Sequence, residues 1–155
     1  MIISREYFEI RRNAQNGCLE SLLELADIYS QGLWNVEINY DLYLNTLIKV
    51  LNQIDDLRNS KFSSSLVTYE VMYLYLKQEN TILAGHYLHN LAWELVWDYP
   101  NGNLEPYIEK YQIREIAECL GIEIEDTIDK VKRFQVAFEP SKYNIVGINH
   151  FFTNS

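Results

Sequence analysis

Cysteine, proline and glycine are all scarce in this sequence. The two cysteines, Cys18 and Cys119, have no metal-ligand spacing and are too few for a disulfide framework, which excludes a disulfide-stapled fold and a cysteine-based zinc site. We therefore expect free thiols in a reducing compartment. Three prolines and six glycines are few for a chain of many strands and turns, so the composition favours helices joined by short loops.

Positive charge and long apolar runs are lacking as well. The chain has 22 acidic and 13 basic side chains and a formal net charge of -9, which disfavours binding to nucleic acid or to an anionic membrane surface. No window approaches the length of a transmembrane span, and the first ten residues have neither a charged leader nor the apolar core of a signal peptide. We therefore expect a cytoplasmic protein that binds neither nucleic acid nor a membrane.

Hydrophobic and aromatic residues, in contrast, are abundant. They make up 48% and 14% of the chain, whereas disordered sequences are poor in both. A chain of 155 residues is long enough to build a single hydrophobic core. We expect one helical domain over residues 1–155, in which the apolar tail, residues 140–155, packs on the helices.

Helical periodicity is clearest between residues 18 and 53. Apolar side chains recur there at steps of three and four on both sides of a short loop, which predicts two amphipathic helices packed on each other. Gly32 can end the first helix and Asn39 can cap the second. We expect the apolar loop 33–38 to fold back onto the two helices, and the serine-rich stretch 55–65 to form a flexible loop. Similar patterns along the chain predict an all-α fold of about seven helices in antiparallel hairpins.

The first hairpin carries a family pattern. Its residues are Leu25, Ala26, Ile28, Tyr29, Gly32, Val36, Asn39 and Tyr40. Over residues 18–53 the chain thereby resembles the Sel-like class of tetratricopeptide repeats, although Tyr43 replaces a small alanine of that family and Asn39 an aspartate. A degenerate second copy is expected over residues 66–96. The resemblance implies a short stack of helical hairpins that serves as an adaptor or scaffold protein.

Two histidines are the best candidates for metal chemistry. His86 and His89 lie three residues apart on a predicted helix and could share a metal, with Glu79 or Glu94 as third ligand. Because no third ligand has a fixed spacing, hydrogen-bonding histidines are the favoured interpretation, and a small metal-dependent enzyme is the alternative. Adjacent carboxylates do not by themselves make an acid–base pair, which needs two groups held across a cleft. We therefore predict no catalytic site, no metal and no cofactor.

Two tryptophans are the best candidates for binding another protein. They lie four residues apart on the predicted helix over residues 81–97, away from its main apolar stripe, and each is followed by an acidic residue. Aromatic anchors ringed by acid are typical of a hot spot for a basic partner, unless another helix covers them. Two adjacent aspartates further upstream are also candidates for contact with a basic partner, because of their negative charge. The partner-binding candidates are Trp93, Glu94, Trp97, Asp98, Asp55 and Asp56.

In type, though not in motif, a short, acidic, aromatic-rich chain resembles the bacterial immunity proteins that neutralise cognate toxins, often basic nucleases. The resemblance implies that acidic side chains meet the lysines and arginines with which the toxin binds phosphate, and so block substrate entry. We therefore expect a protein-binding module whose partner is a basic toxin domain, acting as a monomer or a homodimer. A Sel-like adaptor is the alternative within the binding class.

Overall fold

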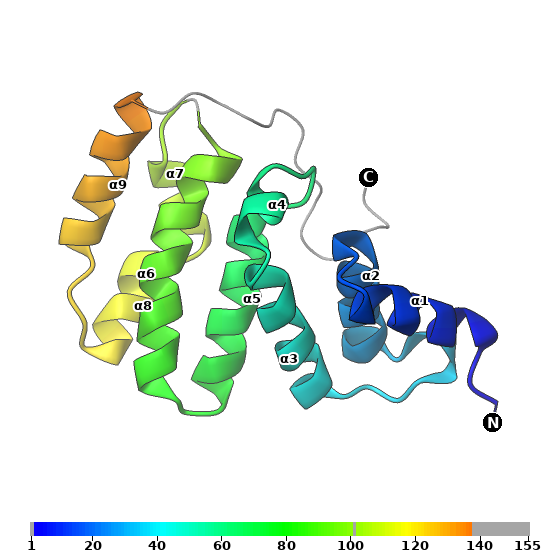
Figure 1. Ribbon diagram of the computed structural model, residues 1–155. Helices are drawn as coiled ribbons and strands as arrows, with labels where there is room; N and C mark the ends of the chain where they lie inside the picture. Colours follow the sequence, from blue (N-terminus) through cyan, green and yellow to red (C-terminus); the bar gives the residue numbers. More distant parts are fainter. Residues whose placement is uncertain (1, 101, 138–155) are drawn as a thin grey trace. The chain divides into compact units, whose positions relative to one another are not determined.

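Every regular element of the described chain is a helix. The computed structural model describes residues 2–100 and 102–137, and within these ranges it contains helices and no strand, which confirms the all-α prediction (Figure 1). The predicted packing of residues 140–155 lies outside the described residues. None of the helices described is both long and apolar enough to cross a bilayer. The helices are α1 (Arg5–Gln15), α2 (Leu19–Gln31), the short 3-10 helix η1 (Leu33–Asn35), α3 (Tyr40–Leu51), α4 (Ile54–Arg58), α5 (Ser64–Lys77), α6 (Thr81–Asp98), α7 (Glu105–Lys110), α8 (Ile113–Leu120) and α9 (Glu125–Ala137).

The helices form two compact units. Unit 1 contains the described residues up to Phe62, and unit 2 begins at Ser63 and includes the described residues up to Ala137. Each unit has fully buried apolar side chains of its own, such as Leu23 in unit 1 and Leu91 in unit 2. The single domain over residues 1–155 stays a prediction.

Unit 1 is built around α2, which packs against α1 on one side and α3 on the other. Its Leu23, Ala26 and Ile28 have no exposed surface, as the periodicity of the sequence predicts. The helix ends at Gly32, whose left-handed φ of 72° costs glycine little because it has no side chain. Asn39 caps α3 as predicted, since its side-chain oxygen accepts the Leu42 N–H at 3.0 Å.

The loop between α2 and α3 folds back only in part. Val36 is half-buried, but Trp34 and Ile38 stay 44% and 53% exposed. Trp34 takes a left-handed φ of 56°, which bulky residues rarely adopt, and its carbonyl accepts the Ser4 N–H at 3.4 Å. The loop is therefore tied to the segment before α1 and covers the helices only in part.

Unit 2 is built around the long helix α6. This helix runs antiparallel to α5 along its length and packs against α8 and α9 on other sides (Figure 1). Val71 and Met72 of α5 are fully buried, as are Leu88 and Leu95 of α6. The hairpin predicted for residues 66–96 is therefore present, whereas its membership of a repeat stays a prediction.

Two local predictions were wrong. The stretch predicted as a flexible loop, residues 55–65, contains α4 and the start of α5, and Ser63, Ser64 and Ser65 are buried. Residues 104–120, where the apolar spacing of Leu104, Tyr107, Ile108 and Tyr111 predicts one helix that ends at Gly121, are divided into α7 and α8, because Gln112 takes a left-handed φ of 54° between them. In both places distant packing partners or a single backbone angle outweigh the local pattern.

Candidate functional site

The tryptophans predicted to bind a partner lie side by side on α6, beneath one aromatic residue of α9. The ring of Phe134 meets that of Trp93 edge to face at 5.7 Å between centroids and that of Trp97 at 6.3 Å. Both tryptophans are half-buried, and Phe134 is itself 41% exposed. The helix α9 therefore covers the tryptophans only in part, and an aromatic cluster remains at the surface of unit 2.

The acids beside these tryptophans do not ring the cluster. Glu94 is 4% exposed and Asp98 is 2% exposed, so both carboxylates are buried in unit 2. Asp98 accepts the backbone N–H groups of Ser64 at 3.2 Å and Ser65 at 2.9 Å, together with the hydroxyl groups of Ser63 and Ser65. A carboxylate at this position satisfies the first N–H groups of α5 and meets the positive end of its dipole. Its role in the structure is to join α5 to α6.

The two aspartates added for their charge, Asp55 and Asp56, are exposed in the first turn of α4. They belong to unit 1, whereas the tryptophans belong to unit 2. As surface acids they remain available for a partner, and their role in binding stays a prediction.

The two histidines lie on the same face of α6 as the tryptophans. They line a hollow of about 390 Å³ together with Ile82, Gly85 and Ile122, among others. His89 Nδ1 lies 2.7 Å from the hydroxyl group of Thr127 on α9, and His86 Nε2 lies 3.3 Å from the amide nitrogen of Asn90. Among the described residues no group of three or more His, Cys, Asp or Glu side chains is placed to hold a metal ion. The third ligand of the metal hypothesis is therefore not beside the two histidines.

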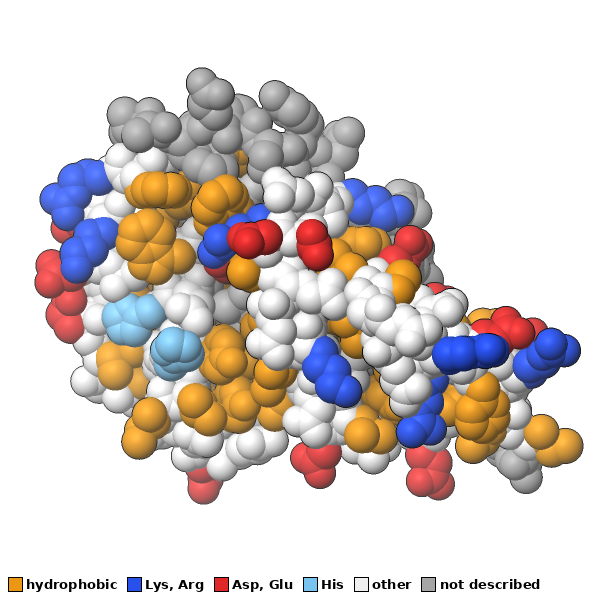
Figure 2. Space-filling view, in the orientation of Figure 1, with side chains coloured by type: hydrophobic (Ala, Val, Ile, Leu, Met, Phe, Trp, Pro, Cys, Tyr) orange, Lys and Arg blue, Asp and Glu red, His pale blue; other side chains and the backbone are white. Residues whose placement is uncertain are grey.

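These side chains form one continuous surface feature, which we call the α6 stripe. Its α6 members follow each other at steps of three and four residues, the spacing of one helix face. From residue 82 to residue 97 such a face is roughly 22 Å long at 1.5 Å per residue. Figure 2 shows both histidines at the surface with hydrophobic side chains around them. The α6 stripe consists of Ile82, His86, His89, Trp93 and Trp97 of α6 and Phe134 of α9.

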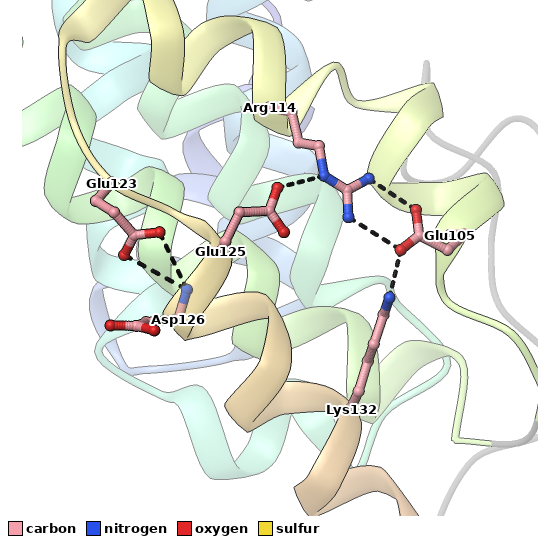
Figure 3. A network of polar contacts seen from close by, with 6 residues as sticks. All are labelled: Glu105, Arg114, Glu123, Glu125, Asp126 and Lys132. Carbon is pink, nitrogen blue, oxygen red and sulfur yellow. Dashed lines mark hydrogen bonds and ion pairs between the residues drawn. The ribbon is translucent and has the colours of Figure 1, made fainter.

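A charged network in unit 2 joins α7, α8 and α9 (Figure 3). Arg114 binds both carboxylate oxygens of Glu105, at 2.7 and 3.0 Å, and reaches Glu125 at 2.6 Å, while Lys132 also pairs with Glu105. The hydrogen bonds from Arg114 and Lys132 lower the pKa of Glu105 to about 2. Two acids and two bases compensate each other here, so we interpret the network as a link between three helices and not as an acid–base pair.

Unit 1 has a second surface, which no pattern in the sequence identified as a binding site. Eight large apolar residues between positions 2 and 42 are exposed by 41% or more, which is unusual for a surface that meets only water. Hydrophobic side chains are visible at the surface near the N-terminus in Figure 2. The apolar loop 33–38 is the sequence feature that indicates this surface, although its composition predicts that it folds inward. The eight residues, which we call the unit 1 apolar surface, are Ile2, Ile3, Phe8, Leu33, Trp34, Ile38, Tyr40 and Leu42.

A groove lies between α1, α2 and α3, and two residues of this surface, Ile3 and Leu42, line it. It consists of two adjoining hollows of about 540 and 440 Å³, which share Tyr29 and Leu42 as lining residues. The hydroxyl groups of Tyr7 and Tyr29 lie 2.9 Å apart and hydrogen-bond each other in its floor. Burial, and then the contact with Tyr7, raises the pKa of the Tyr29 hydroxyl, which is therefore neutral at any physiological pH.

Comparison of this chain with protein-family models, with curated proteins and with solved structures gives no match.

Proposed function

We propose that this protein is a non-catalytic binding module that holds a basic protein partner on the α6 stripe of unit 2. The observation that carries the proposal is the aromatic cluster of Trp93, Trp97 and Phe134, which remains partly exposed after α9 has packed on α6. Tryptophan supplies large, rigid contact area and is enriched at the energetic centre of protein interfaces. Ile82, which is 84% exposed, extends the same face.

The charge of the chain supports a basic partner. Residues 63–137 contain twelve acidic and six basic side chains, a net charge of -6, and residues 1–62 carry -3. Because Glu94 and Asp98 are buried, the attraction comes from the net negative charge of unit 2 as a whole, to which the exposed acids Glu115 and Glu118 of α8 contribute. A field of this sign speeds the approach of a basic protein more than it tightens the final complex.

Neutralisation of a basic toxin domain, in the manner of an immunity protein, is the specific form of this proposal. A module of this kind acts by occupying the toxin's substrate surface, which requires contact area and charge but no chemistry of its own. A Sel-like adaptor would use the same kinds of contact. The immunity protein and the adaptor differ in whether the partner is toxic, since a toxin harms the cell when it is made alone.

The experiment is affinity capture from the cells that make this protein, with matched variants. Ile82→Lys places a repelling charge on the α6 stripe, and Ile2→Lys places the same charge on unit 1 at a residue that is 87% exposed. We expect a basic protein to be captured by the wild type and by Ile2→Lys but lost with Ile82→Lys. Its association rate should fall steeply as salt rises. A partner held equally by all three proteins, or a partner of acidic charge, would contradict the proposal.

The immunity form has a further measurement. We expect the captured protein to stop growth when it is expressed alone, and growth to return when the wild type is expressed with it. Ile82→Lys should restore growth less well than Ile2→Lys. A partner that is harmless when expressed alone would contradict the immunity proposal and would be consistent with an adaptor.

A further inference from the structure

The groove of unit 1 carries opposite charges at its two ends. Glu37 lines the hollow that also contains Ile3 and Val36, whereas Arg11 and Lys49 line the adjoining hollow. All three charged side chains are exposed. The apolar middle of the groove, where the two hollows meet, is formed by Tyr29 and by Leu42, which is 42% exposed.

The helix α3 sets this order of charges. Glu37 precedes the helix, and Leu42, Asn45 and Lys49 follow at steps of three and four residues on one exposed face. Lys49 lies roughly 10 Å beyond Leu42 along the axis at 1.5 Å per residue. Along the groove the order is therefore an acid before the helix, then leucine, asparagine and a base on one face of α3.

A surface with this order is complementary to itself. When two copies meet about a two-fold axis, the same patch of each protomer contacts the other in reversed direction. Glu37 of one protomer then lies beside Lys49 and Arg11 of the second protomer, and the reverse pair forms on the other side of the axis. The two α3 helices run antiparallel and meet near their amino ends, at Leu42.

We propose that a second copy of this chain occupies the unit 1 groove, in a two-fold homodimer whose α3 helices pack antiparallel around Leu42. Two exposed apolar side chains, Ile3 and Leu42, line the groove and would be covered by this contact. The proposal concerns unit 1 alone and does not depend on the α6 stripe or on the nature of any other partner.

The test is a pair of charge reversals, Glu37→Lys and Lys49→Glu, made separately in the full chain. Each variant alone would place two like-charged pairs in its homodimer, because residue 37 of one protomer faces residue 49 of the second. We expect each to weaken self-association about tenfold or more, measured by sedimentation velocity over a range of concentrations. Asp55→Lys, a reversal of an exposed acid on α4, is the control and should leave self-association unchanged.

Mixing the two variants is the decisive step. A heterodimer of Glu37→Lys with Lys49→Glu contains two pairs of opposite charge, so we expect the mixture to associate about as tightly as the wild type, and far more tightly than either variant alone. A wild type that remains monomeric at millimolar concentration would overturn the proposal. So would reversals that weaken nothing, or a mixture that associates no better than its components.

Discussion

The role of Asp98 in the structure differs from the role that the sequence suggests. In the sequence it stands beside Trp97 and suggests an acid at the edge of a binding surface. In the structure it is buried, and its carboxylate holds the first turn of α5 through two backbone N–H groups and three serine hydroxyl groups. Side chains 33 to 35 positions away therefore determine what this residue does.

Replacing Asp98 should destabilise the protein strongly. Asp98→Ala removes the acceptor for buried N–H groups of Ser64 and Ser65, and unsatisfied buried groups of this kind cost about 1–3 kcal/mol, more when a charged partner is lost. We expect the free energy of unfolding, measured with urea, to fall by about 3 kcal/mol. Asp56→Ala, at an exposed acid, should change it by less than about 0.5 kcal/mol. A small effect at Asp98 would contradict its role as the acceptor for the first N–H groups of α5.

The link through Glu105 should make stability depend on pH in a definite direction. Its folded pKa of about 2 lies below the value of roughly 4.3 for an unfolded glutamate. The stabilisation is therefore complete above roughly pH 4.3 and is lost as the pH falls towards 2.

Glu105→Gln should reveal this dependence. Because Glu105 is partly exposed, we expect the variant to lose only about 0.5–1 kcal/mol at pH 7. The difference from the wild type should shrink as the pH falls from 5 to 2, and also in 1 M salt, when urea unfolding is measured under each condition. A difference that persists at pH 2 would contradict the ion-pair explanation.

At the scale of elements, two helices end in the same way but in different surroundings. Gly32 after α2 and Gly121 after α8 both take a left-handed φ, 72° and 69°. A Cβ on Gly32 would lie 3.2 Å from a side-chain carbon of Ile38 and 3.3 Å from the carbonyl of Val36, whereas a Cβ on Gly121 would meet no atom within 4 Å. A side chain would strain the backbone at both positions, but only at Gly32 would it also crowd neighbouring atoms.

The two glycines make a matched pair for alanine substitution. Gly121→Ala should cost about 1 kcal/mol of stability, since an L residue in this conformation pays only the backbone penalty. Gly32→Ala should cost about 2 kcal/mol or more, because the loop 36–38 must also move. Thermal unfolding of both variants measures the difference. Equal costs would show that the loop yields without resistance.

At the scale of the whole molecule, the two proposed surfaces lie in different units and should act independently. Ile82→Lys on the α6 stripe should abolish capture of the basic partner and leave self-association unchanged. Glu37→Lys in the unit 1 groove should weaken self-association about tenfold and leave partner binding unchanged. Sedimentation and affinity capture on both variants test this. Loss of both properties in either variant would mean that the surfaces are coupled.

Part of the aromatic cluster can be predicted from the sequence, and part cannot. The spacing of Trp93 and Trp97 placed both on one face of a helix, and the structure adds His86, His89 and Ile82 to the same face. Phe134 could not be assigned to the cluster, because it lies 37 residues after Trp97 and only the packing of α9 on α6 brings the rings together. The same packing decides that the tryptophans are half-covered.

The sequence by itself determined the helical character of the chain, the cap at Asn39 and the stop at Gly32, because apolar periodicity, capping and left-handed residues act over a few neighbouring positions. The tertiary structure alone decided which acids are buried, which aromatic rings meet and which apolar residues stay exposed. The sequence of Ser63 to Ser65 is typical of a loop, but in the structure Asp98 accepts their N–H and hydroxyl groups. The sequence predicts that Trp34 is buried, but the backbone of its loop directs it outward. Exposure depends on contacts between distant segments, and local pattern does not encode them.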